Sequence, residues 1–128
     1  MKKLLSGNLL LLFILLFTSC SNEDSNKTDF LYGKWEIDTA YRNGNKTELL
    51  TGLFFEFSAD GNMRTNITGN PESVRFEIEE NNIAQREGRI DLDYEIVELN
   101  DSSLIIKTSI RNSKLQLNLK KLIPEISE

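Results

Sequence analysis

The sequence contains no histidine and only one cysteine, Cys20. Histidine is the side chain that most often acts as a general base or binds a transition metal near neutral pH. A single cysteine cannot form a disulfide within the chain, so the fold must depend on its hydrophobic core. The sequence also lacks the glycine-rich loops that hold phosphates. From these absences we predict no enzyme, no catalytic residue, no metal site and no cofactor.

Positive charge is also in short supply. Lys and Arg number 15 against 20 Asp and Glu, which gives a net charge of −5 at pH 7. Nucleic-acid binding relies on clustered basic side chains, and a polybasic patch is what adds electrostatic attraction to a lipid anchor. Because the sequence has no such cluster, we predict no nucleic-acid partner.

Carboxylates are plentiful, and Asp91-x-Asp93-x-Glu95 has a spacing that could suggest a metal site or an acid–base pair. In an extended strand these three side chains alternate with apolar residues and point to the opposite face of the sheet. The favoured interpretation is a solvated outer face.

The N-terminus carries the longest apolar run of the chain. Lys2 and Lys3 come first, followed by the run from Leu9 to Phe17 and then by Thr18-Ser19-Cys20. This order of charged, apolar and small residues is typical of an export signal. The run is shorter than the roughly 20 residues that a membrane-spanning helix needs. We therefore expect residues 1–19 to be a signal peptide.

Phe17-Thr18-Ser19-Cys20 resembles the lipobox of bacterial lipoproteins, in which the cysteine is acylated and becomes the first mature residue. The resemblance implies a palmitate-type lipid on Cys20, attachment to a membrane, and a place at the outer membrane, on its periplasmic or cell-surface face. Ser21–Asp29 has no apolar residue, which predicts a flexible tether over residues 20–29. Glu23-Asp24 resembles an acidic surface-export signal, and an ordinary solvated linker explains the same pair.

From Phe30 onward, apolar and polar residues alternate with the period of two that is typical of half-buried strands. A change of parity at Val97 predicts a β-bulge or a bend, and Thr47–Leu50 leaves room for one helical turn. We expect about eight short strands, including a short one around Ile83–Arg86. The other inward-facing series are Trp35, Ile37, Thr39, Tyr41; Leu53, Phe55, Phe57; Met63, Thr65, Ile67; Val74, Phe76, Ile78; Ile90, Leu92, Tyr94, Ile96; Leu104, Ile106, Thr108, Ile110; and Leu115, Leu117, Leu119.

The expected strands are separated mostly by tight turns, such as Asn43-Gly44-Asn45 and Asp60-Gly61. Short turns without a long crossover predict an all-β, antiparallel up-and-down meander over residues 30–123, followed by a tail over 124–128. Eight such strands close most naturally into a barrel, because closure removes the exposed edges. A two-sheet sandwich is the alternative.

Leu31-x-Gly33-x-Trp35 at the start of this meander resembles the opening motif of the lipocalins, and in particular of the small lipocalin-like domains of bacterial lipoproteins. The resemblance covers roughly residues 31–122. It implies that Gly33 turns the chain sharply into the barrel and that Trp35 plugs the closed end. In lipocalins a basic side chain of the last strand often packs over this tryptophan, and the candidates here are Arg111, Lys120 and Lys121. The Thr-Asp-Tyr motif of larger lipocalins is missing, so their ligand loops are not expected.

An eight-stranded barrel is wide enough either to be filled by side chains or to hold one small molecule. For a ligand we expect a mostly apolar pocket lined by Thr39, Tyr41, Phe55, Phe57, Thr65, Phe76, Tyr94 and Thr108. The first hypothesis is a lipid-anchored envelope protein that binds a small apolar or amphipathic molecule without catalysis. The alternative is a filled barrel that serves as an interaction or inhibitor module for an envelope protein. Phe54 is expected to face outward, where it would seat a partner or the Leu49-Leu50 segment.

Overall fold

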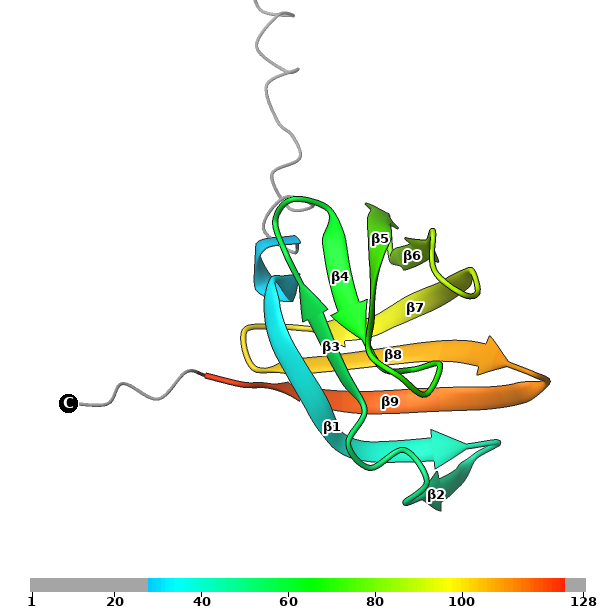
Figure 1. Ribbon diagram of the computed structural model, residues 1–128. Helices are drawn as coiled ribbons and strands as arrows, with labels where there is room; N and C mark the ends of the chain where they lie inside the picture. Colours follow the sequence, from blue (N-terminus) through cyan, green and yellow to red (C-terminus); the bar gives the residue numbers. More distant parts are fainter. Residues whose placement is uncertain (1–27, 124–128) are drawn as a thin grey trace, which may run out of the picture.

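The computed structural model describes residues 28–123. The predicted signal peptide, Cys20, most of the tether and the tail lie outside the described residues. A helical turn over residues 28–31 leads into nine strands (Figure 1). They are β1 (Gly33–Arg42), β2 (Asn45–Thr47), β3 (Phe54–Phe57), β4 (Asn62–Thr65), β5 (Glu72–Glu79), β6 (Asn82–Arg86), β7 (Leu92–Leu99), β8 (Ser103–Ile110) and β9 (Ser113–Lys121).

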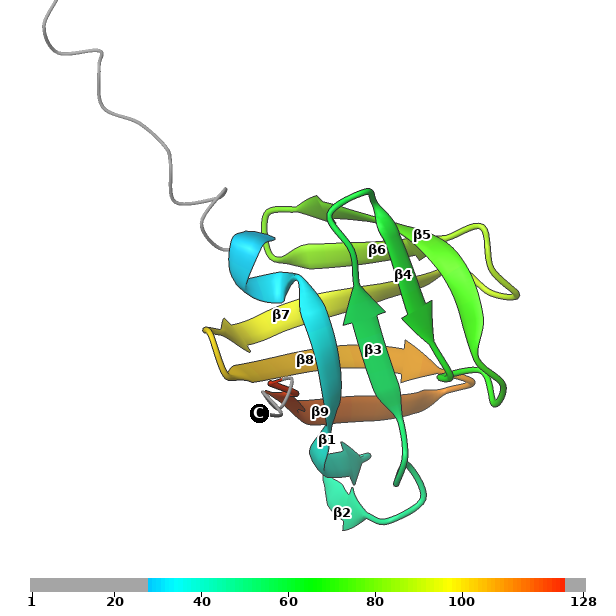
Figure 2. The same ribbon diagram turned by 60° about the vertical axis from the view of Figure 1, so that its left-hand side comes forward.

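The strands form one antiparallel sheet that closes on itself. β1 pairs with β3 through Trp35 and Phe55 and with β9 through Ile37 and Leu119, which joins the two ends of the sheet. β2 pairs with β1 alone, so eight strands form the barrel wall and β2 extends from it. Figure 2 shows β7, β8 and β9 crossing behind β1, β3 and β4. The predicted eight-stranded barrel is confirmed, in place of the sandwich.

A bulge in β1 changes which of its side chains enter the barrel. The register with β9 shifts between Ile37 and Thr39, and Ala40 becomes the next buried residue. Thr39 and Tyr41 therefore lie on the outer face. The unbroken alternation predicted from Trp35 onward is wrong here, because one extra residue in a strand reverses the facing of every residue after it.

The second bulge lies in β7, where the register with β8 shifts between Ile96 and Glu98. It confirms the bulge predicted at Val97, whose side chain is exposed.

Two hairpins are closed by two-residue turns with a left-handed backbone. Asn43 and Gly44 have φ angles of 50° and 85°, and Arg111 and Asn112 have φ angles of 51° and 66°. Positive φ at both central positions is the signature of type I′ turns, whose twist matches that of paired antiparallel strands. These turns keep β1–β2 and β8–β9 in register.

The segment between β2 and β3 forms turns instead of the expected helical turn over Thr47–Leu50. Thr47 belongs to β2, and the N–H of Thr51 donates to the carbonyl of Glu48 over 3.3 Å. The N–H of Leu53 donates to the carbonyl of Leu50 over 3.1 Å. Such separate i to i+3 bonds mark successive turns, and they bring the chain from β2 back to the barrel wall.

The interior of the barrel is apolar, as the alternation predicted. Its burial from water is the main favourable contribution to folding for a chain without disulfides in this region. The buried hydrophobic residues are Leu31, Trp35, Ala40, Leu53, Phe55, Phe57, Met63, Val74, Phe76, Ile83, Leu92, Tyr94, Leu104, Ile106, Leu115, Leu117 and Leu119.

Candidate functional site

One end of the barrel is closed by Trp35. Its indole Nε1 donates a hydrogen bond of 2.9 Å to the carbonyl of Leu31, and its side chain is fully buried. Lys121 is the register partner of Trp35 on β9, and its Nζ lies 5.0 Å from the centre of the indole ring. The same Nζ donates to the carbonyl of Phe30 over 2.8 Å. Of the three basic side chains proposed for this contact, the structure selects Lys121.

Gly33 is required at the entrance to this closed end. Its φ of 125° is a conformation that residues with a side chain rarely adopt. A Cβ atom at this position would also stand 3.3 Å from Cε of Lys121. Gly33, Trp35 and Lys121 thus form one packing unit at the start of β1.

Six of the eight residues predicted to line a ligand pocket meet inside the barrel: Phe55, Phe57, Thr65, Phe76, Tyr94 and Thr108. The ring centres of Phe55 and Tyr94 are 5.5 Å apart in an edge-to-face contact, and those of Phe57 and Phe76 are 5.1 Å apart. Phe55 and Phe57 stack at 6.1 Å. These aromatic contacts fill much of the interior.

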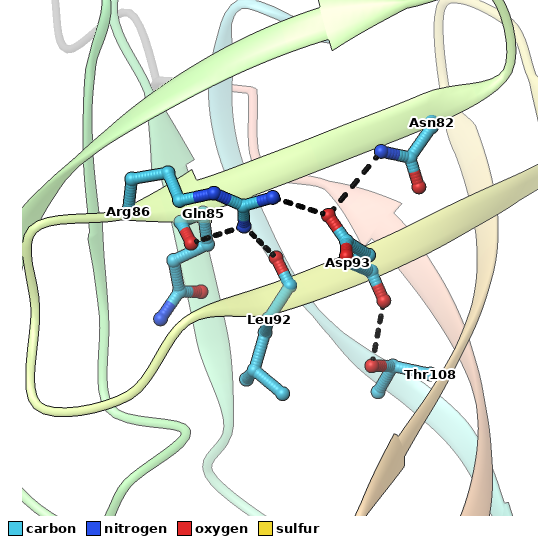
Figure 3. Close-up of polar contacts among 6 residues, drawn as sticks. All are labelled: Asn82, Gln85, Arg86, Leu92, Asp93 and Thr108. Atoms are coloured by element: carbon cyan, nitrogen blue, oxygen red, sulfur yellow. Dashed lines mark hydrogen bonds and ion pairs between the residues drawn. The ribbon is translucent and has the colours of Figure 1, made fainter.

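The two threonines among these six bond to the barrel wall. The hydroxyl of Thr65 donates to the carbonyl of Phe54 over 2.8 Å, and that of Thr108 donates to the carbonyl of Asp93 over 2.8 Å (Figure 3). Thr39 and Tyr41, the remaining two predicted residues, are not brought to this group, because the β1 bulge turns them outward.

A buried polar pair stands beside this aromatic cluster. The Tyr94 hydroxyl donates to Oε1 of Gln85 over 2.6 Å, and both side chains are fully buried. Burial, together with the charge of Glu72, raises the pKa of Tyr94, so its hydroxyl stays protonated. Within residues 28–123, Nε2 of Gln85 is the buried side-chain polar atom that has no hydrogen-bond partner.

Gln85 is the interior polar residue that the sequence analysis missed. It alternates with Ile83 on β6, so its inward position could have been inferred from the same period of two. The signal was weak because the expected strand was short and was bounded by turns.

Two loops are joined by one carboxylate, that of Glu72. Its Oε2 accepts a hydrogen bond of 2.6 Å from the Thr68 hydroxyl, and its Oε1 accepts one of 3.1 Å from the N–H of Arg89. These bonds, with that from Thr68 as the largest cause, lower the pKa of Glu72. Gly88 lies so close to Val74 that a Cβ atom there would stand 2.3 Å from Cγ1 of that valine. Glu72 thus holds the β4–β5 and β6–β7 loops together beside β5.

A groove of about 820 Å³ runs along β7, β8, β9 and β1, and it is lined by residues of the outer face together with the inward-facing Leu92, Thr108 and Leu115. Four of its residues form a row of successive register partners: Glu95, Lys107, Gln116 and Tyr41. Asp91 and Asp93 line the same groove, so this predicted outward face is confirmed. Among the described residues, no three His, Cys, Asp or Glu side chains are grouped so that they could hold a metal ion.

A polar network lies at the edge of this groove (Figure 3). Nη2 of Arg86 is 3.0 Å from Oδ1 of Asp93, and Nδ2 of Asn82 is 3.4 Å from the same oxygen. Nη1 of Arg86 donates to the carbonyls of Gln85 and Leu92 over 2.9 and 3.3 Å. Because Arg86 and Asp93 remain partly exposed, this ion pair positions β6 against β7 more than it stabilises the fold.

Phe54 is covered by cations on the outer face. Nζ of Lys34 lies 5.0 Å from the centre of its ring, and Cζ of Arg64 lies 5.9 Å from it. Of the Leu49-Leu50 segment, one of the two expected occupants of this position, Leu49 is 77% exposed and Leu50 packs against the core. Two cation–π contacts therefore take the place expected for the Leu49-Leu50 segment.

The closed antiparallel barrel, its Gly-x-Trp entrance and the lysine over the buried indole define a lipocalin-type barrel. Residues 31–106 match the lipocalin-like domain family, and the chain belongs to that family. The barrel is similar to the crystal structure of a lipocalin-like protein from Bacteroides uniformis, with a TM-score of 0.54, 13% identity, and coverage of 73% of this chain and 99% of that one. It is also similar to the crystal structure of an uncharacterised protein from Bacteroides eggerthii, with a TM-score of 0.53, 12% identity, and coverage of 72% and 99%. No curated protein matches the sequence.

Proposed function

We propose that this lipocalin-like protein is a lipid-anchored, non-catalytic binding protein of the outer membrane. Acyl chains on Cys20 would hold it to the membrane, with the barrel on the periplasmic or cell-surface side. The barrel would bind one small apolar or amphipathic molecule. The observation that carries this proposal is the buried Nε2 of Gln85, a hydrogen-bond donor without a partner inside an apolar barrel. Among residues 28–123, no helix is both long and apolar enough to cross a membrane.

The small exposed fractions of the residues around Gln85 support a ligand at the layer of Gln85, which comprises Gln85 and its register partners Phe76 and Leu92. Phe76 and Leu92 are the register partners of Gln85 and are 6% and 7% exposed, whereas Trp35 at the closed end is 0% exposed. Thr108 and Leu115 retain 8% each, and with Leu92 they line the groove of about 820 Å³. A mostly apolar site with one or two polar anchors is the usual composition of a small-molecule site.

The chemistry of this layer favours binding over catalysis. Tyr94 keeps its proton because burial raises its pKa, so its hydroxyl offers neither a base nor an activated nucleophile. Gln85 carries an amide, which does not transfer protons near neutral pH. These groups orient a ligand through hydrogen bonds and leave it unchanged.

Native mass spectrometry of the full chain, isolated from the envelope of its own host, tests this function. We expect a co-purifying small molecule that is lost on mild heating and is recovered on rebinding. Protein of the apo mass only, together with no uptake of added apolar molecules, would contradict it.

A second candidate function follows from the groove outside the barrel. Its volume of about 820 Å³ and its row of charged and polar residues suit a polar segment of an envelope protein. A photo-crosslinking residue in place of Tyr41 would capture such a partner from envelope extracts. Its capture should fall when Lys107→Glu reverses a charge in the groove, and crosslinking that this change leaves intact would count against the groove.

A further inference from the structure

We propose that the barrel selects its ligand by a neutral oxygen: Gln85 Nε2 donates to the carbonyl, ether or hydroxyl oxygen of a small, mostly apolar molecule, and the corresponding carboxylates are rejected. This inference rests on the proposed function and names the chemical class of its ligand.

Nε2 of Gln85 is a free hydrogen-bond donor. Oε1 of Gln85 is already bonded to the Tyr94 hydroxyl over 2.6 Å, whereas Nε2 has hydrogens and no acceptor. Figure 3 shows the Gln85 side chain extending away from Arg86 and Asp93, whose charged groups pair with each other at the partly exposed surface. A buried donor without a partner is unfavourable, so an oxygen acceptor that enters the barrel gains this hydrogen bond.

Among residues 28–123, no other interior side chain offers an unpaired hydrogen-bond donor. The buried polar residues of the described chain are Thr65, Gln85 and Thr108. Both threonine hydroxyls donate to backbone carbonyls. The amide of Gln85 is therefore the polar group that would bind the oxygen of a ligand.

The interior of the barrel disfavours a negatively charged ligand. None of the described lysines and arginines is buried, so the interior supplies no counter-charge for an anion. Glu72 is close enough that its negative charge contributes to the raised pKa of Tyr94, the residue bonded to Gln85. An ionised carboxylate would lose its hydration and meet this negative field, whereas a neutral oxygen would not.

The aromatic side chains of the interior limit the size of the ligand. Phe55, Phe57, Phe76 and Tyr94 already contact one another in the interior, so a ligand beside them must be small. Residual exposure at Phe76 and Leu92 places the approach at the layer of Gln85. A chain of about six carbons with one oxygen is the appropriate scale for a probe of this layer.

The test compares three probes of matched length, namely butyl methyl ketone, hexanoate and hexane, in NMR titrations of the full chain in detergent. The side-chain NH₂ signals of Gln85 are assigned from their loss in Gln85→Met. We expect the ketone to shift these signals saturably, hexane to bind more weakly, and hexanoate at neutral pH to leave them unchanged. In Gln85→Met, ketone affinity should fall roughly five- to tenfold while hexane affinity is retained.

Asn118→Leu is the control, because this amide lies on the outer side of β9, away from both the interior and the groove, and should leave all three titrations unchanged. If Gln85→Met does not fold, the double variant Gln85→Met/Tyr94→Phe removes both members of the pair, and the comparison of ketone with hexanoate needs no variant.

Two kinds of failure are distinguishable. Equal binding of ketone and hexane, or of ketone and hexanoate, would overturn the selection by a neutral oxygen while leaving interior binding intact. Absence of any probe from the interior, with only water at the Gln85 amide, would overturn both the selection and the proposed function.

Discussion

The hydrogen bond from Tyr94 to Gln85 joins two polar side chains in an otherwise apolar barrel. A buried polar pair of this kind stabilises the fold only while both members are present, since each satisfies part of the other's hydrogen-bonding capacity. At the scale of single residues, replacing one member of the pair leaves the other without its partner.

Tyr94→Phe removes the hydroxyl and leaves the whole Gln85 amide without a partner. We expect a loss of about 1–3 kcal/mol in the free energy of unfolding. Adding Gln85→Met should recover most of this loss, because the double variant buries no unpaired polar group. Urea unfolding of the wild type, both single variants and the double variant measures the coupling, and simple additivity of the two changes would contradict the pairing.

Trp35→Ala removes the largest buried side chain at the closed end. We expect a loss of about 3–5 kcal/mol, because a large-to-small change in a packed core leaves a cavity. Lys121→Met, which removes the cation over the ring and keeps much of the packing, should cost about 0.5–1 kcal/mol. Thermal unfolding separates the two, and a neutral Trp35→Ala variant would refute the role of Trp35 as the plug.

At the scale of elements, the bulge in β1 lets one strand serve two surfaces. Before the bulge, Trp35 enters the core, and after it Tyr41 reaches the groove on the outer face. β1 also changes its neighbour along its length, pairing with β3 through Trp35 and with β2 through Ala40. The bulge thus places the barrel plug and the groove on the same strand.

The loop contacts of Glu72 give the stability of the barrel a dependence on pH. Its pKa in the folded protein is lowered from the ordinary value of 4.5, so the ionised form is the one that favours folding. The contribution is present above 4.5 and is lost as the pH falls through the lowered pKa. We expect Glu72→Gln to be less stable than the wild type at neutral pH and equal to it in acid. Urea unfolding at both pH values measures the difference, and Glu77→Gln, at an exposed position on the same strand, is the control.

At the scale of the whole molecule, the proposed lipid anchor is separate in sequence from the folded barrel. Cys20 lies outside the described barrel, and the core is formed by residues 31–119. We expect Cys20→Ala to abolish incorporation of labelled palmitate and to move the protein from the membrane fraction to the soluble fraction. Its thermal unfolding should match that of the wild type. Persistent palmitate labelling of Cys20→Ala would show that the lipid is attached elsewhere.

The interior candidates were predicted well where no bulge precedes them on their strand. Phe55, Phe57, Phe76 and Tyr94 all lie inside, because the alternation of each strand is a local property that its sequence displays. The prediction was wrong at Thr39 and Tyr41, since no local pattern marked the bulge before them. Gln85 was missed because a polar residue on a short strand resembles a turn residue until its neighbours are known.

The sequence by itself determined the alternating strands with their tight turns and the Gly-x-Trp entrance of a lipocalin-like barrel, and it predicts an export leader. These features depend on residues that are close together along the chain. The tertiary structure decided which cation covers Trp35, which side of β1 faces water after Ile37, and that Gln85 meets Tyr94 inside the barrel. Each of those outcomes depends on the register between strands, and register is settled by the packing of the whole barrel at once.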